Sequence, residues 1–350
     1  MALGGVEISP RVPISDAFVR SLGGIVSDFL TLAAANLLSP IVLCFVLGAV
    51  AAGLRSDLSI PESVAKGIAI YLMLAIGLKG GVSMAGAETE GAVPAIVVAI
   101  AVSFALPVVG YYLLRRVARA PVADAAAIAA HYGSVSVVTF VTAQQFLAAR
   151  GVPFEPYLVA MLAAMETPAI VTGLALARMG GVAGRSGEAR GHVLREVFLN
   201  GSVVLLVGGF AIGWVVGPQG MVKVAPLMVD LFNGLLCLFL LDMGLVAVRQ
   251  LRSISELRPT LVAFAIVMPI IGATVGIVGA YVLGLSPGGA ALFAILGGSA
   301  SYIAVPAAMR LALPQARASI YVTLSLGITF PFNVVFGIPL YYAVAERLFV

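Results

Sequence analysis

This chain carries little charge for its length. Only 10% of its 350 residues are Asp, Glu, Lys or Arg, whereas 61% are hydrophobic and the mean hydropathy is +1.11. Water-soluble domains have about 25% charged residues, because their surfaces must be polar. The scarcity of charge therefore excludes an ordinary soluble protein. The hydrophobic residues form long continuous runs, which predicts an all-α polytopic membrane protein and argues against the short alternating strands of a barrel.

Cysteine and histidine are also scarce. The two cysteines, Cys44 and Cys237, both lie inside hydrophobic runs, and there are two histidines. This excludes a disulfide framework and the usual metal-ligand spacings. The sequence has no HExxH zinc motif, no clear GxSG nucleophile and no pair of catalytic aspartates. We expect no enzyme, no resident cofactor or metal, and no nucleic-acid partner, since the formal charge of +4 is explained by loops between the runs.

The second half of the chain repeats the first. The matches keep their order and are offset by about 162 to 167 residues. The matched segments are Tyr71–Lys79 with Leu238–Leu245, Pro107–Gly110 with Pro269–Gly272, Gly133–Ser136 with Gly298–Ser301, and Thr167–Pro168 with Phe330–Pro331. Each copy holds an odd number of hydrophobic runs, so the copies must cross the membrane in opposite senses. Inverted repeats of this kind are typical of secondary transporters.

The runs predict ten transmembrane helices as two inverted five-helix repeats. They cover about 37–54, 65–85, 93–114, 124–149, 157–177, 198–217, 225–248, 260–284, 288–312 and 318–345. Each is long enough at 1.5 Å per residue for a hydrocarbon core of about 30 Å. We divide the chain into an N-terminal extracellular or interfacial segment (1–36), a first repeat (37–177), a cytoplasmic linker (178–197) and a second repeat (198–350).

Charge bias orients these spans. Of the 20 Lys and Arg residues, 14 lie in the loops that follow the odd-numbered spans. The positive-inside rule places those loops in the cytoplasm and both termini outside.

Two spans break the rules of helix formation, 124–149 and 288–312. Each has glycine and clustered hydroxyls near its middle: Gly133, Ser134, Ser136 and Thr139 in the first, and Gly298, Ser299, Ser301 and Tyr302 in the second. Glycine disfavours helix, and serine satisfies freed backbone groups. We expect two half-helices in each span, with the breaks meeting near the bilayer midplane. Helix N-termini there suit a small anion, and C-terminal carbonyls suit Na⁺. The alternative reading is that small residues only allow close helix packing.

Ionisable residues inside spans are costly and need a reason. Lys79 and Asp242 lie in repeat-related spans, so they form an ion pair, cap half-helix ends or couple to an ion. Because the two spans run in opposite directions, the alternative is that these residues lie at different depths. Glu166 and Thr167 precede Pro168, which frees a backbone carbonyl, so they form a cation site or Glu166 is a protonated or hydroxyl-bonded buried acid.

Two further polar residues border these features. Asn333 follows Pro331 and either completes a polar site or bridges helices. His131 borders the first break, where a packing role is favoured over a proton relay.

With these motifs in place, the sequence resembles the sodium-dependent bicarbonate transporter family over about residues 37–345. The resemblance rests on Ile76–Gly81, Gly133–Ser136, Glu166–Ala169 and Pro306–Arg310, in order and at the family's spacing. It implies five plus five inverted spans, a homotrimer in the bacterial inner (cell) membrane lipid, and a mobile core moving against a scaffold of spans 1, 2, 6 and 7. It also implies elevator-like, Na⁺-coupled import of bicarbonate, and in some members a PII-like cytoplasmic regulator.

The chain departs from its cyanobacterial relatives in several places. Those proteins have an acid where this chain has Tyr302 and a serine where it has Val138, and their long acidic insertion is reduced here to the linker. Lys79 and Asp242 each stand about one turn from the relatives' charges. A transporter of a different small anion, and an anion channel or uniporter on the same fold, therefore remain alternatives.

Overall fold

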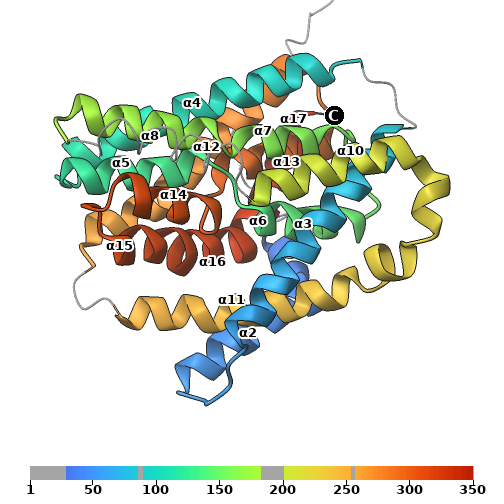
Figure 1. Cartoon of the computed structure of the whole chain (residues 1–350), viewed down its shortest axis with the longest axis horizontal. Helices are drawn as coiled ribbons and strands as arrows, with labels where there is room; N and C mark the ends of the chain where they lie inside the picture. The colour runs from blue at the N-terminus through green and yellow to red at the C-terminus, as the bar shows by residue number, and fades with distance from the viewer. Residues whose placement is uncertain (1–28, 86–89, 183–200, 254–256, 350) are drawn as a thin grey trace, which may run out of the picture.

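The computed structural model describes residues 29–85, 90–182, 201–253 and 257–349 (Figure 1). That part of the chain is helical throughout, without strands. Residues 1–28 of the predicted N-terminal segment and 183–197 of the predicted linker lie outside the described residues.

The helices follow the predicted runs closely. The first half contains α2 (Pro40–Gly53), α3 (Glu62–Ala85), α4 (Ala92–Arg116), α5 (Val122–Gly133), α6 (Val137–Ala148), α7 (Leu158–Met165) and α8 (Pro168–Met179). The second half contains α10 (Gly201–Val222), η1 (Pro226–Asp230), α11 (Phe232–Ser253), α12 (Pro259–Leu283), α13 (Pro287–Gly298) and α14 (Ala304–Ala312). It ends with α15 (Ala318–Val322), η2 (Thr323–Thr329), α16 (Phe330–Phe332), η3 (Asn333–Gly337) and α17 (Ile338–Leu348).

Eight of the described helical segments are long and apolar enough to cross a membrane, and the chain is a multi-pass membrane protein. The number is nine if the bent pair Phe29–Leu37 and Pro40–Gly53, which meet at 67°, is a single span. The predicted span 288–312 is not among the eight, because residues 299–303 separate it into two short helices, α13 and α14. Its first part, α13, has 12 residues and is about 18 Å long.

Local sequence explains where the helices begin and end. Gly284 adopts a left-handed conformation (φ 65°) that ends α12, and Ser286 then caps α13 by accepting a hydrogen bond from the Gly289 N–H at 3.1 Å. Pro287 occupies the first position of α13, where its missing N–H costs nothing.

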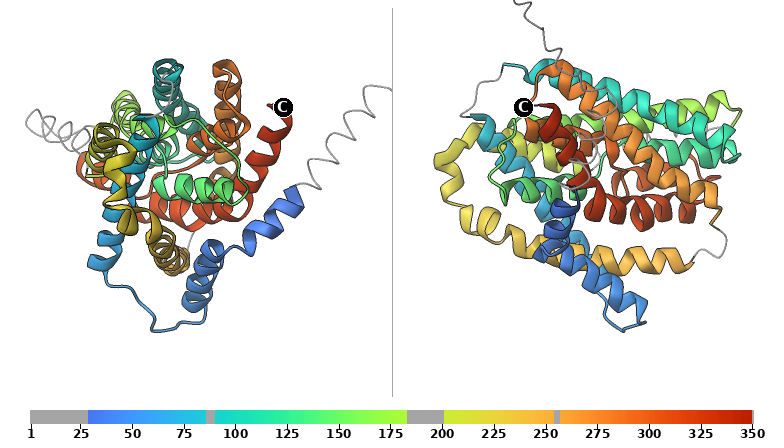
Figure 2. Two further views of the ribbon diagram at one scale, coloured as in Figure 1. Left: turned by 90° about the vertical axis from the view of Figure 1, so that its right-hand side faces the viewer. Right: turned by 180° about the vertical axis from the view of Figure 1, so that it is seen from behind.

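Two helix pairs, α3 with α10 and α2 with α11, pack at unusually short range along one flank of the molecule (Figure 2). Glycine makes this approach possible. A Cβ at Gly48 of α2 would collide with the Leu241 carbonyl of α11, and a Cβ at Gly213 of α10 would collide with the Leu78 carbonyl of α3. We call these four helices the flank group.

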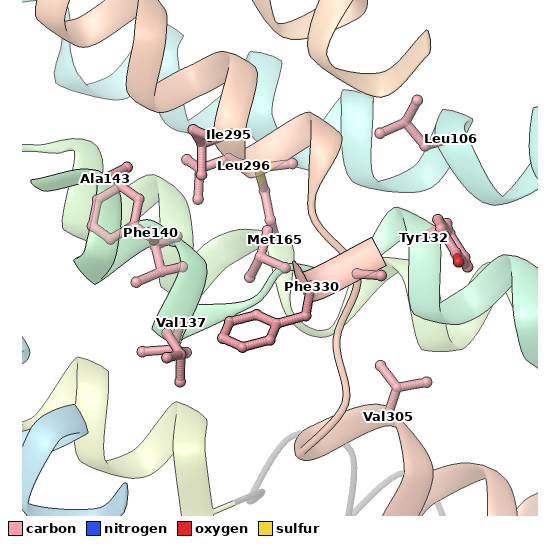
Figure 3. Packing of buried hydrophobic residues seen from close by; sticks show 14 of the residues in the cluster. Leu106, Tyr132, Val137, Phe140, Ala143, Met165, Ile295, Leu296, Val305 and Phe330 are labelled. Atoms are coloured by element: carbon pink, nitrogen blue, oxygen red, sulfur yellow. The ribbon is translucent and has the colours of Figure 1, made fainter. Parts of the chain in front are cut away.

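The remaining helices surround α5, α6 and α13. Residues 123–143, which include the whole first break, are all buried, and the alanine-rich α5 lets neighbouring helices approach closely. Figure 3 shows Phe140, Met165, Ile295 and Phe330 packed together at the centre of this group. The predicted breaks therefore lie inside protein, away from lipid, where irregular backbone is tolerated.

Candidate functional site

The first break separates α5 from α6. The helix ends at Gly133, Ser134 is extended (φ −86°, ψ 176°), and Ser136 is the N-cap of α6 (φ −104°, ψ 107°). The predicted interruption of this span is confirmed.

The second break separates α13 from α14. The helix ends at Gly298, Ser299 is extended (φ −95°, ψ 170°), and helix resumes at Ala304. This interruption is confirmed as well.

The two breaks touch each other directly. The Ser136 N–H donates to Ser299 Oγ at 2.9 Å, and the Ser301 N–H donates to the His131 carbonyl at 2.9 Å. Each break thus provides the hydrogen-bond acceptor for a backbone N–H group of the other. The expected meeting of the two serine clusters is confirmed, although they are 163 or more residues apart in sequence.

The glycines at the breaks make room for a neighbouring proline. A Cβ on Gly133 would collide with the ring of Pro107 in α4, and a Cβ on Gly298 would lie 2.8 Å from the Pro269 carbonyl of α12. Gly133 and Gly298 therefore let each broken helix end against the preceding span.

The hydroxyls of the first break are arranged around Ser136. Its oxygen accepts from the Thr139 N–H at 3.2 Å and from the Thr139 hydroxyl at 2.9 Å. With its oxygen so occupied, the Ser136 hydroxyl proton remains available to a bound group. Ser134 donates to the Glu166 main-chain carbonyl at 3.2 Å, which ties the break to the α7–α8 junction.

The two serine hydroxyls of the second break form hydrogen bonds with local backbone. Ser299 Oγ donates to the Leu296 carbonyl at 3.3 Å while accepting from Ser136. Ser301 Oγ accepts from the Val305 N–H at 3.4 Å and so stabilises the start of α14.

Within the described part of the chain, three buried polar atoms beside the breaks have no hydrogen-bond partner: Tyr302 Oη, Glu166 Oε2 and His131 Nε2. The Tyr302 hydroxyl lies near Ser136 without hydrogen-bond geometry, and its ring packs on Phe330 at 5.3 Å. An unsatisfied buried group costs about 1–3 kcal/mol, so such groups indicate a place where a ligand supplies the missing partner.

Glu166 and Thr167 lie where α7 gives way to α8. Glu166 is the C-cap of α7 and is 2% exposed, and Thr167 is the N-cap residue of α8, ahead of Pro168. The carboxylate does not bond to the Ser134 hydroxyl, which takes the main-chain carbonyl instead. A buried acid is thus held next to the first break with one oxygen uncommitted.

Asn333 bridges helices at the second break. Its Nδ2 donates to the Gly298 carbonyl at 2.8 Å, and its Oδ1 accepts from the Tyr341 hydroxyl at 3.2 Å. Of the two predicted roles, bridging is the one for which the structure supplies partners.

His131 packs against an aromatic ring and lies within hydrogen-bond distance of backbone on its own helix. Its ring lies 4.5 Å from that of Tyr321, and its Nδ1 is 2.6 Å from the Ala127 carbonyl one turn earlier.

Lys79 and Asp242 do not pair, which corrects the pairing interpretation. Lys79 Nζ lies over the Phe232 ring, 4.3 Å from its centroid. Phe232 precedes Asp242 by ten residues, about 15 Å along α11, so the two charges lie at different depths. Ion pairs of the described residues include Lys66–Glu62 and Arg317–Asp124.

Sequence reasoning missed two acids that hold the N-terminal ends of α5 and α13, the ends away from the breaks. Asp124 of α5 accepts from the Arg317 main-chain N–H and guanidinium at 2.6–2.9 Å. Glu155 accepts from the Ser286 N–H at 2.6 Å and hydroxyl at 3.2 Å, at the start of α13. An acid in the first turn of a half-helix was the available signal for Asp124.

Two mutually bonded broken helices inside an all-helical multi-pass bundle define the class of a membrane transporter, not an enzyme. The chain belongs to the Na⁺-dependent bicarbonate transporter superfamily, whose family model matches residues 40–346. No individually curated protein matches the chain.

Proposed function

We propose that this protein is a secondary active transporter that imports bicarbonate, or a similar small anion, together with Na⁺. The observation that carries the proposal is the reciprocal bonding of the two breaks, through Ser136 to Ser299 and Ser301 to His131. Membership of the superfamily supports both the ion and the anion. The transported species would occupy the junction that the two breaks share.

An inverted repeat of five plus five spans is supported by contacts that recur at the repeat offset. Ser103 donates to the Met165 carbonyl at 2.7 Å, and Thr329 donates to the Ala265 carbonyl at 2.6 Å, so the paired positions differ by 162 and 164 residues. The contacts of the two acids recur as well. Asp124 corresponds to Ser286 and Glu155 to Arg317, each at an offset of 162 residues, and the bonded pairs are Asp124–Arg317 and Glu155–Ser286. Such recurrence follows when two copies of one unit face each other.

The anion would sit at the N-terminus of α6. The N–H groups of Val137 and Val138 have no intrahelical partner because of their position, and the helix dipole favours negative charge there. The Ser136 hydroxyl and the Tyr302 hydroxyl are two further donors at this end. A small oxyanion with several acceptor oxygens matches this set of donors.

Sodium would be coordinated by Glu166 with Thr167. Oxygen ligands and a negative charge suit a hard cation, and the uncommitted Glu166 oxygen provides both. Since Tyr302 stands where related transporters have an acid, Glu166 is the carboxylate left beside the first break.

Movement would follow an elevator scheme in a homotrimer, with both termini outside the inner membrane. The flank group supports this scheme. Its helices pack against each other at glycines over long stretches, whereas they contact the central helices at fewer positions. The flank group would form the static scaffold, and α5, α6, α13 and α14 would carry the anion across.

Uptake of labelled bicarbonate into proteoliposomes, with and without an inward Na⁺ gradient, tests the proposal. We expect saturable uptake that requires the gradient and falls at least tenfold in Ser136→Ala and Ser301→Ala, since each loses a break hydroxyl. Ser56→Ala, in the α2–α3 loop, is the matched control. Normal uptake by both break variants would refute the site.

An anion channel on the same fold is the second candidate, favoured by Tyr302 in place of an acid. A channel would pass bicarbonate current in planar bilayers without Na⁺, whereas a coupled transporter gives Na⁺-dependent, saturable flux.

A further inference from the structure

A cavity with a polar side lies away from the breaks, between the flank group and the central helices. It has a volume of about 220 Å³ and is lined by Lys79 and Ser83 of α3, Gln144 and Gln145 of α6, and Phe232 of α11. Figure 1 shows α3 crossing beside α6. The cavity thus touches both of the groups that an elevator would move apart.

The polar side chains that line this cavity are uncommitted. Lys79 rests on the Phe232 ring, and within the described residues the side chains of Lys79, Ser83, Gln144 and Gln145 form no hydrogen bond or ion pair. Among the described residues, no Asp or Glu lines the cavity. In the described lining, a half-buried ammonium and two free amides therefore form a set of hydrogen-bond donors without an anionic acceptor.

A larger cavity of about 820 Å³ adjoins the first and shares Gln145 and Ala148 with it. Its lining contains a second cation, Arg150, and the amide residue Asn233, again without an acid. In the described lining each cavity thus has one cation and no acid, although Glu346 interacts electrostatically with Arg150, so Lys79 is the cation without a nearby acid. A positively charged lining concentrates anions.

Helix α6 connects this region to the breaks. Ser136 caps its beginning, and Gln144 lies eight residues further along the same helix, about 12 Å away. By the positive-inside orientation, both cavities lie on the outer half of the membrane, the side from which an imported anion arrives.

We propose that Lys79, Gln144 and Gln145 form a capture site that binds the small oxyanion between the flank group and α6 before it reaches the breaks. The inference deepens the proposed function and rests on it for the identity of the anion. Lys79 would supply the charge, and the two amide groups would donate hydrogen bonds to carboxylate-type oxygens. The cost of holding an unpaired lysine inside a span is then explained by ligand binding.

A thiol placed in the cavity tests its charge without any transport measurement. In full-length protein with Cys44→Ser and Cys237→Ser, the variant Ser83→Cys is modified with an anionic or a cationic methanethiosulfonate reagent. We expect the ratio of anionic to cationic rates to fall about tenfold when Lys79→Met is added, and bicarbonate to slow modification only while Lys79 is present. An unchanged ratio, or no protection by bicarbonate, overturns the capture site.

Uptake kinetics in proteoliposomes provide the second arm. We expect Lys79→Met to raise the half-saturating bicarbonate concentration about tenfold with little change in maximal rate, and Lys79→Arg to stay within about threefold of the parent. Lys66→Met, which removes the exposed cation of the same helix, is the control. Equal half-saturation in Lys79→Met and the parent overturns the capture site. If the break variants keep full uptake, the proposed function fails instead, while the thiol ratio still reports on the cavity.

Discussion

At the scale of single residues, neighbouring groups limit which hydrogen bonds each residue of the site can still form and how large its side chain can be. Ser136 receives two hydrogen bonds on its oxygen and so has only its proton to offer. Gly133 has no space for a side chain, because the Pro107 ring occupies it. Glu166 is buried with an uncommitted oxygen. Each of these constraints leads to a measurable consequence.

Replacement of Gly133 by alanine should destabilise the protein by about 1–3 kcal/mol, because the new methyl group must displace Pro107 in a packed core. The measurement is denaturant unfolding of the detergent-solubilised protein. Gly67→Ala is the control, since nothing lies within 4 Å of a Cβ there and alanine favours the helix. Equal loss in both variants would contradict the packing role.

Glu166→Gln should raise the Na⁺ concentration needed for half-maximal uptake about tenfold or more, because a full negative charge is removed from the proposed cation ligands. Uptake measured across a Na⁺ series gives the value. Glu62→Gln, an exposed acid paired with Lys66, should leave the Na⁺ dependence unchanged. An unaltered Na⁺ response in Glu166→Gln would remove this residue from the cation site.

At the scale of elements, the first half of each broken helix is held at both of its ends. The C-terminal ends of α5 and α13 are held by the contacts between the breaks, and their N-terminal ends are held by Asp124 and Glu155. A half-helix of 12 residues is too short to be stable alone, so these terminal contacts decide where it lies.

Asp124→Asn should weaken the connection between α5 and the loop before α15, because it removes the charge that accepts three hydrogen bonds from Arg317. We expect a loss of about 1–2 kcal/mol in unfolding free energy, less than for a fully buried pair because the Arg317 side chain is 60% exposed. A double-mutant cycle with Arg317→Gln isolates the coupling. Additive losses would show that the pair does not act together.

At the scale of the whole molecule, the arrangement separates into a flank group and a central group that carries both breaks (Figure 2). Contacts between the groups include Gly80 of α3 against Val159 of α7. Contacts inside the central group include Gly110 of α4 against Ala129 of α5, where an added Cβ would be 3.6 Å from the alanine Cβ. These two contacts allow the elevator scheme to be tested with disulfides.

An added Cβ on Gly80 would lie 2.7 Å from the Val159 Cβ, so α3 and α7 must separate by about 1 Å to reach the Cβ spacing of a disulfide. In a background without native cysteines, oxidation of Gly80→Cys with Val159→Cys should abolish uptake relative to the reduced protein, because the bond joins the two groups, and reduction should restore it. The control pair, Gly110→Cys with Ala129→Cys, lies within the central group, so its disulfide should leave uptake intact. Full uptake by the oxidised intergroup pair would contradict relative movement.

Much of the fold follows from the sequence, because membrane helices are set by local rules. Hydrophobic length determined the spans, and glycine and serine within 124–149 and 288–312 located the interruptions before any coordinates. The repeat offset indicated that the breaks belong together. Of the two alternatives for Lys79 and Asp242, pairing was wrong and different depths agrees with the structure. The sequence left both open, because it gives a residue's helix but not its depth relative to a residue on another helix.

The sequence by itself therefore determined the membrane class, the order of the helices and the positions of the breaks, since each depends on residues close together in the chain. Only the tertiary structure decided which polar atoms bond to each other, which remain unpartnered, and that Lys79 shares a cavity with Gln144 and Gln145. The reason is that packing between distant segments sets the direction and depth of each side chain, and no local pattern records that geometry.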